Sequence, residues 1–206
     1  MNTILDIVTQ QLGGSNLGQI SRQIGADETR TQSAIAMALP VLIGAMARNA
    51  SDPAGAAALD RALQNHDGSA LDNLGSLLGR GTNARAGAGI LGHILGGKRA
   101  PVEQGIGQAT GLTSQQVGKL LIVLAPIVMA ALSRMRQQRA AGGAEAPGVD
   151  AVLQQEQQEV ARRAPDAGGL AGILDKNDDG SIVDDLARMA PGMLGGLFGG
   201  GAGGRS

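Results

Sequence analysis

Two long apolar segments, each with a proline inside it, restrict the folds that this chain can adopt. They run from Ile35 to Met46 and from Leu121 to Leu132, and they contain Pro40 and Pro126. The longest apolar run is 13 residues, from Leu120 to Leu132, against the roughly 20 that a membrane-spanning helix needs. We therefore expect two buried core helices. Because proline removes one backbone donor, each helix should be kinked or split in two.

The side chains available for a core also favour helices. The sequence has no tryptophan or tyrosine and one phenylalanine, Phe198, so aliphatic, methionine and alanine side chains must form the core. Such side chains suit closely packed helices better than aromatic-rich strands, and we predict an all-α fold. Apolar spacing, together with glycine stops, the N-cap Asp27 and a capping box of Thr113 and Gln116, predicts the individual helices. They cover residues 4–12, 17–24, 54–64, 71–78, 90–95 and 149–163. Two longer helices run from the Asp27 cap through Met46 and from the Thr113–Gln116 box through Leu132.

The chain repeats itself. An offset of 86 residues matches the two apolar segments without a gap, and an offset of 112 matches Asn65–Leu74 with Asn177–Leu186. Pairs that share the first offset include Gly25 with Gly111, Pro40 with Pro126, Ala45 with Ala131 and Arg48 with Arg134. Because the elements follow the same order in both halves, the sequence predicts an internally duplicated helical bundle.

This duplication divides the chain into five parts. Residues 1–85 form the first helical repeat and residues 86–139 the start of the second. A flexible linker at 140–148 leads to a C-terminal helical part at 149–194, which carries an acidic loop. The glycine-rich tail at 195–206 is expected to be disordered.

The acidic loop lies between Leu174 and Leu186, in the sequence LDKNDDGSIVDDL. Counted from Asp175 as position 1, the loop follows the ligand spacing of a calcium loop up to position 7. Position 12 is Leu186, where an EF-hand has a glutamate that binds calcium through both carboxylate oxygens. The loop thus resembles the shorter DxDxDG calcium loops, in which Asp184 or Asp185 would close the site. The predicted calcium ligands are Asp175, Asn177, Asp179, Ser181, Asp184 and Asp185. Calcium is the only cofactor that the sequence suggests.

A capped turn explains part of the same loop without a metal. Ser181 and Asp184 fit a capping box that starts the last helix, and Ser69 and Asp72 repeat this box in the first half. There the first ligand position is Leu63, which cannot bind a metal. Asp175, Asp178 and Asp185 occur only in the second copy, and the sequence alone leaves both interpretations open.

Charge and composition exclude several functions. The formal net charge is -1, so the chain lacks the field that concentrates a protein on DNA or anionic lipid. Cysteine is absent, and the only histidines, His66 and His93, have no matching carboxylate pattern. We predict a non-enzymatic interaction or structural module with an unidentified protein partner. Its N-terminal sequence, with Asp6 and no basic region, predicts a cytoplasmic location. The short apolar runs predict no transmembrane segment.

A nucleic-acid-binding regulator is the alternative. Residues 19–35 and 105–121 resemble helix-turn-helix segments, but the second runs into the apolar stretch Leu120–Leu124, where a recognition helix should expose polar side chains. A basic surface formed jointly by Arg22, Arg30 and Lys119 would favour this alternative. An apolar groove beside the proline-containing helices would instead favour protein binding.

Three motifs together indicate a family. They are G-x-T-x-x-Q at Gly111–Gln116, the apolar helix with Pro126, and L-D-x-N-x-D-G-S-x-x-D-D-L at Leu174–Leu186. This pattern resembles the bacterial domain-of-unknown-function 937 family and its YidB-like relatives over roughly residues 1–195. The resemblance implies an all-helical, internally duplicated bacterial protein without an established activity.

Overall fold

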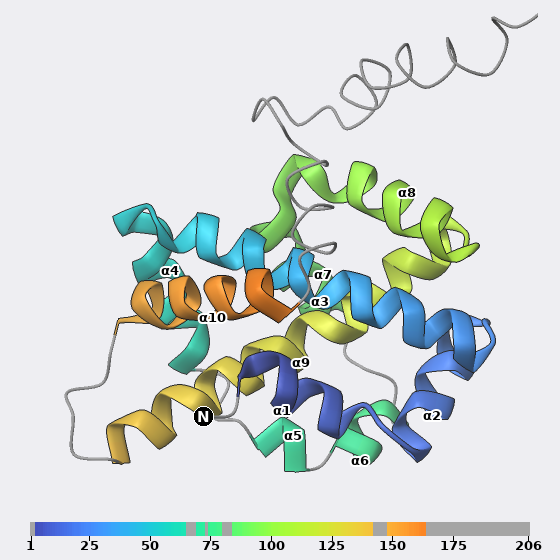
Figure 1. Cartoon of the computed structure of the whole chain (residues 1–206), viewed down its shortest axis with the longest axis horizontal. Helices are drawn as coiled ribbons and strands as arrows, with labels where there is room; N and C mark the ends of the chain where they lie inside the picture. The colour runs from blue at the N-terminus through green and yellow to red at the C-terminus, as the bar shows by residue number, and fades with distance from the viewer. Residues whose placement is uncertain (1–2, 65–68, 73, 80–83, 142–147, 164–206) are drawn as a thin grey trace, which may run out of the picture.

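The computed structural model of the chain describes residues 3–64, 69–72, 74–79, 84–141 and 148–163 (Figure 1). Within these ranges every regular element is a helix, which confirms the predicted all-α class. The α-helices are α1 (Ile4–Gln11), α2 (Ser15–Ile24), α3 (Glu28–Ala50), α4 (Pro53–Gln64), α5 (Ser69–Asp72), α6 (Leu74–Gly79), α7 (Ala84–Leu95), α8 (Arg99–Thr110), α9 (Ser114–Ala141) and α10 (Val149–Arg163). A short 3₁₀ turn, Gly96–Lys98, joins α7 to α8.

The two proline-containing segments form the central helices α3 and α9, around which the other helices pack. Leu42 and Ile43 of α3 are fully buried, as are Leu121 and Val128 of α9. Both helices are continuous, so the predicted alternative of a split at Pro40 or Pro126 is wrong. Each proline removes a single N–H donor, whereas splitting either helix would expose apolar side chains on both sides of the break.

Several predicted boundaries agree with the structure, and others move by a few residues. Helices α4 and α10 lie where the sequence places them. The described residues of the predicted helix at 71–78 belong to α5 and α6, and residue 73 between them lies outside the described residues. The predicted start of the second repeat, at residue 86, falls inside α7, and α9 extends two residues into the predicted linker. The predicted acidic loop and glycine-rich tail lie outside the described residues.

Two helices are long and apolar enough to cross a membrane when judged by length and composition alone. They are Glu28–Ala50 and Ser114–Arg139, and within the fold 72% and 78% of their apolar windows are buried. Core helices that cross no membrane pass the same test. The predicted absence of a transmembrane segment and the predicted cytoplasmic location therefore stay predictions.

The start of α1 has two caps, and one of them comes from the far end of the described chain. Thr3 Oγ1 accepts a hydrogen bond from the Asp6 N–H, and Asp6 Oδ2 accepts one from the Thr3 N–H, each at 3.0 Å. Glu156 of α10 then accepts a hydrogen bond from the Ile4 N–H at 2.7 Å. Glu156 is only 2% exposed. Its carboxylate thus ties α10 to the N-terminal helix.

Burial raises the pKa of Glu156 above its ordinary value of 4.5. The hydrogen bond from Ile4 and the positive charge of Arg139 oppose this rise, while the negative charges of Asp6 and Glu159 add to it. Since the pKa is higher in the folded state than in the unfolded state, protonation of Glu156 favours folding. That contribution is fully present below pH 4.5 and is lost as the pH rises through the folded-state pKa.

Glu156→Gln is therefore expected to raise the melting temperature at pH 8. Glutamine keeps a carbonyl acceptor for the Ile4 N–H but carries no charge, so the advantage over the parent protein should shrink as the pH falls towards 4.5. Thermal melts between pH 4.5 and pH 8 measure this difference. Glu28→Gln is a control, because Glu28 is exposed at the start of α3. A Glu156→Gln protein that is less stable by the same amount at every pH would contradict the expectation.

Candidate functional site

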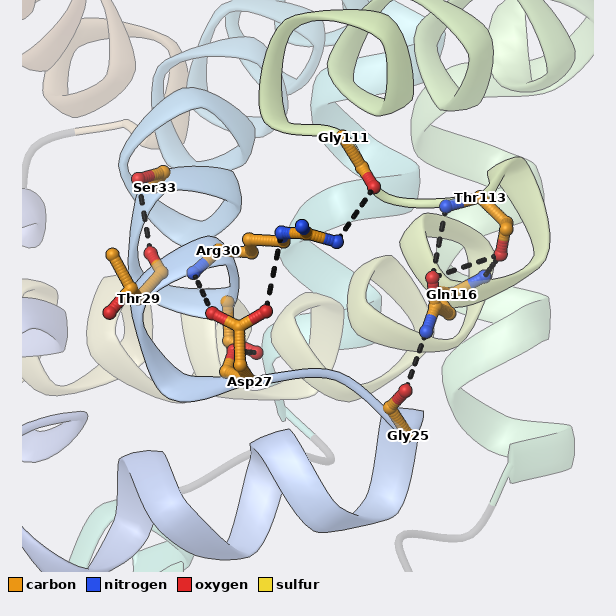
Figure 2. Close-up of polar contacts among 9 residues, drawn as sticks. Gly25, Asp27, Thr29, Arg30, Ser33, Gly111, Thr113 and Gln116 are labelled. Atoms are coloured by element: carbon orange, nitrogen blue, oxygen red, sulfur yellow. Dashed lines mark hydrogen bonds and ion pairs between the residues drawn. The ribbon is translucent and has the colours of Figure 1, made fainter.

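The two turns predicted to belong to helix-turn-helix segments face each other (Figure 2). Helix α2 ends at Gly25 with φ 74°, and Asp27 Oδ1 accepts a hydrogen bond from the Arg30 N–H at 2.9 Å to cap α3. In the second half, α8 ends at Gly111 with φ 72°. The predicted capping box follows, because Thr113 Oγ1 accepts from the Gln116 N–H at 3.2 Å and Gln116 Oε1 accepts from the Thr113 N–H at 2.9 Å.

Equivalent residues of the two turns contact each other reciprocally. Gln116 Nε2 donates a hydrogen bond to the Gly25 carbonyl at 2.6 Å, and a guanidinium nitrogen of Arg30 donates to the Gly111 carbonyl at 3.5 Å (Figure 2). The offset of 86 pairs Arg30 with Gln116 and Gly25 with Gly111. Reciprocal contacts of this kind are typical of a two-fold axis. The contacts agree with the predicted duplication, whose common origin stays a prediction.

Arg22, Arg30 and Lys119, whose joint basic surface would favour nucleic-acid binding, are all exposed. Arg30 forms an ion pair with Asp27 at 3.3 Å, and the side chains of Arg22 and Glu28 lie together over Gly18. Arg30 and Gln116 also hold the two turns together, so they are occupied by contacts within the protein. Acidic side chains therefore lie among the arginines that the nucleic-acid hypothesis requires.

An apolar groove lies beside the C-terminal half of α3, where α4 and α7 approach it. Its cavity has a volume of about 430 Å³. The apolar lining includes Met46, Leu59, Ala62, Ile90, Ile94 and Met129, and the polar lining consists of Arg48, Asn49, Asp52 and His93. A groove in this position, beside a proline-containing helix, is the feature expected of a protein-binding module.

Two of the polar residues hold the groove together. Asn49 Nδ2 donates hydrogen bonds to the carbonyls of His93 and Ile94 at 2.9 and 3.0 Å, which fastens the end of α7 to α3. Those carbonyls belong to the last turn of α7, where no further N–H of the helix can reach them. Asp52 Oδ2 accepts from the Gly55 N–H at 3.0 Å and caps α4. Arg48 and the His93 imidazole are exposed beside the apolar lining.

The predicted calcium ligands are not part of this geometry. Asp175, Asn177, Asp179, Ser181, Asp184 and Asp185 all lie outside the described residues, so the calcium loop stays a prediction. Within the described part of the chain, no group of three or more His, Asp or Glu side chains could hold a metal ion. His66 is also outside the described residues.

The first copy of the loop makes a contact that sequence reasoning missed. Asp72, a predicted member of a capping box, lies at the end of α5, and its Oδ1 accepts a hydrogen bond from a guanidinium nitrogen of Arg134 at 2.9 Å. This ion pair joins α5 to α9 across 62 residues. The two charged residues lie in different motifs, and nothing in their local sequence connects them.

The part of the chain that contains both capped turns matches a family of bacterial proteins. A family model described as "Bacterial protein of unknown function (DUF937)" matches residues 6–135. The chain belongs to this family. The DUF937 match covers both capped turns and most of the two central helices, whereas the acidic motif at 174–186 falls outside it. No curated protein and no solved structure matches the chain.

Proposed function

We propose that this DUF937 protein is a non-enzymatic interaction module that holds an apolar helical segment of a partner protein in the groove between α3, α4 and α7. The observation that carries the proposal is the combination of an apolar lining with an exposed arginine and histidine beside it. A cavity of about 430 Å³ lies within the range of about 300–1,000 Å³ that ligand pockets usually have. An amphipathic helix would place side chains at i, i+3 and i+4 into such a groove.

The chemistry of the lining supports binding and does not support catalysis. Among the described residues, the lining contains no serine, threonine, cysteine, lysine or glutamate. Asn49 and Asp52 are used to fasten α7 and to cap α4. Arg48 and His93 then favour a partner segment that carries a carboxylate beside its apolar side chains. Calcium binding by the 175–185 loop is a separate part of the proposal, supported by ligand spacing alone.

Photo-crosslinking from Leu59 tests the proposal. Leu59 is half-buried in the groove lining, whereas Gln10 of α1 is exposed outside that lining and serves as the control position. With a photoreactive residue at 59 and a native bacterial lysate, we expect adducts that map to an amphipathic helical segment with an aspartate or glutamate beside its apolar face. The probe at 10 should not form them. Identical adducts from both positions would contradict the proposal.

A further inference from the structure

The contact between α5 and α9 shows how the first copy of the acidic motif is held. Helix α5 packs on α9, and the Asp72–Arg134 ion pair fixes its polar side at 2.9 Å. Leu71 and Leu74 are only 1% and 2% exposed. The Asp72 carboxylate and the buried leucines beside it therefore anchor α5 to the central helix α9.

Every part of this anchor has a counterpart in the other half. The offset of 86 pairs Arg134 with Arg48, and the offset of 112 pairs Asp72 with Asp184. The buried Leu71 and Leu74 correspond to Val183 and Leu186. The ten residues from Asn65 and the ten from Asn177 are identical at six positions, including this aspartate.

The groove lies where the counterpart of this anchor should be. Arg48 belongs to its lining, together with Ile90 and Ile94 of α7. Under the same offset of 86, Ile90 and Ile94 of α7 correspond to Ile4 and Val8 of α1. The packing corresponds as well, because α1 packs on α9 and α7 packs on α3. The reciprocal contacts of the two capped turns show that the halves face each other in the way this comparison needs.

We infer that residues 177–190 of this same chain occupy the groove, with Asp184 paired to Arg48 and with Val183 and Leu186 against the apolar lining. This inference rests on the proposed function of the groove. It implies that the groove is regulated, because a partner segment would have to displace the chain's own segment. Reach is sufficient, because the 20 residues from 164 to 183 can span up to about 65 Å. They follow α10, which packs on α3 and α4, two walls of the groove.

Charge supports the same occupant. The segment from 177 to 190 contains four aspartates and one arginine, and Arg48 and His93 lie exposed in the groove lining. Pairing Asp184 with Arg48 leaves Asp175, Asn177 and Asp179 available to a calcium ion, so the two roles of the segment are compatible.

Crosslinking between engineered cysteines tests the inference in the full chain, which contains no cysteine of its own. The test pair is Arg48→Cys with Asp184→Cys, and the reference pair is Asp72→Cys with Arg134→Cys, at the observed ion pair. Arg48→Cys with Arg205→Cys is the control for random encounters. With a short bis-maleimide, we expect the test pair to crosslink within the molecule at a rate similar to the reference pair, and at least tenfold faster than the control. A test pair no faster than the control, beside an efficient reference pair, would overturn the inference.

A charge exchange gives a second readout that does not depend on crosslinking geometry. Ile90→Cys places a thiol in the groove lining. Arg48→Glu or Asp184→Arg should each speed its modification several-fold, because like charges expel the segment, and the two changes combined should restore the slow rate. Simple addition of the two single effects would argue against the pair. If both cysteine tests fail while Leu59 still forms adducts with a partner, only the inference about residues 177–190 is removed. If the internal crosslinks form but Leu59 captures no partner, only the proposed function is removed.

Discussion

Replacing Gly87 with alanine is expected to lower the free energy of unfolding by about 1–3 kcal/mol, the usual cost of overpacking a buried contact. Gly87 is a buried residue of α7. A Cβ atom at this position would overlap the carbonyl oxygen of Ile122 and lie 2.9 Å from Ile122 Cγ2. The obstacle is backbone in the middle of α9, so it cannot swing away as a side chain would.

Pro126 affects the same carbonyl of Ile122 that Gly87 approaches. In an α-helix, the carbonyl of Ile122 would accept a hydrogen bond from the N–H of residue 126, but proline has no N–H. Helix α7 therefore approaches α9 at the point where the proline leaves a backbone carbonyl without its helical donor. Only glycine lets α7 come this close, because any other residue would place its Cβ on that carbonyl.

Gly89→Ala is the matched control for Gly87→Ala. Gly89 lies in the same helix and is exposed, and a Cβ atom at this position would meet no neighbouring group within 4 Å. Alanine there should stabilise the protein by about 0.5–1 kcal/mol through its higher helix propensity. Urea denaturation of both variants measures the contrast. Changes of the same sign in the two variants would contradict the close packing of α7 on α9.

Filling the groove should abolish the capture of a partner. Ala62 is a half-buried residue of the groove lining, so Ala62→Trp puts an indole into the space that the partner helix needs. We expect the yield of Leu59 adducts to fall at least tenfold, which corresponds to about 1.4 kcal/mol of binding free energy. Since the chain has no tryptophan of its own, the fluorescence of the introduced indole reports whether it is buried.

Ala57→Trp separates the loss of the groove from the loss of the fold. Ala57 belongs to the same helix, α4, but is exposed and outside the groove lining. This variant should keep the parent level of adducts, and both variants should keep the helical circular dichroism of the parent. Equal losses from Ala62→Trp and Ala57→Trp would show that the groove is not the binding surface.

Local signals in the sequence are sufficient to predict most helix ends. Asp27 and Thr113 cap α3 and α9 as predicted, because a cap depends on residues three positions apart. Glycine in the left-handed region ends α2 and α8 at Gly25 and Gly111 for the same local reason. The two prolines lie inside helices as expected, but neither splits its helix, because burial keeps α3 and α9 continuous.

Contacts between distant residues cannot be predicted in this way. The hydrogen bond from Ile4 to Glu156 spans 152 residues, and only the packing of α10 brings the two groups together. The groove needs α3, α4 and α7 in place, so no single motif indicates it. The predicted duplication is a sequence signal that relates distant residues, since its offsets pair the observed Asp72–Arg134 contact with Asp184 and Arg48.

A methionine methyl NMR titration tests most simply whether the groove binds the chain's own apolar, acid-bearing segment. Met46 and Met129 belong to the groove lining, whereas Met37 and Met135 lie elsewhere on α3 and α9. The probe is a synthetic peptide with the sequence of residues 174–194, added to full-length protein carrying Asp184→Arg so that its own segment is displaced. We expect saturable shifts of the Met46 and Met129 signals, with the Met37 and Met135 signals unchanged. Unchanged Met46 and Met129 signals, or equal shifts of all four, would contradict this expectation.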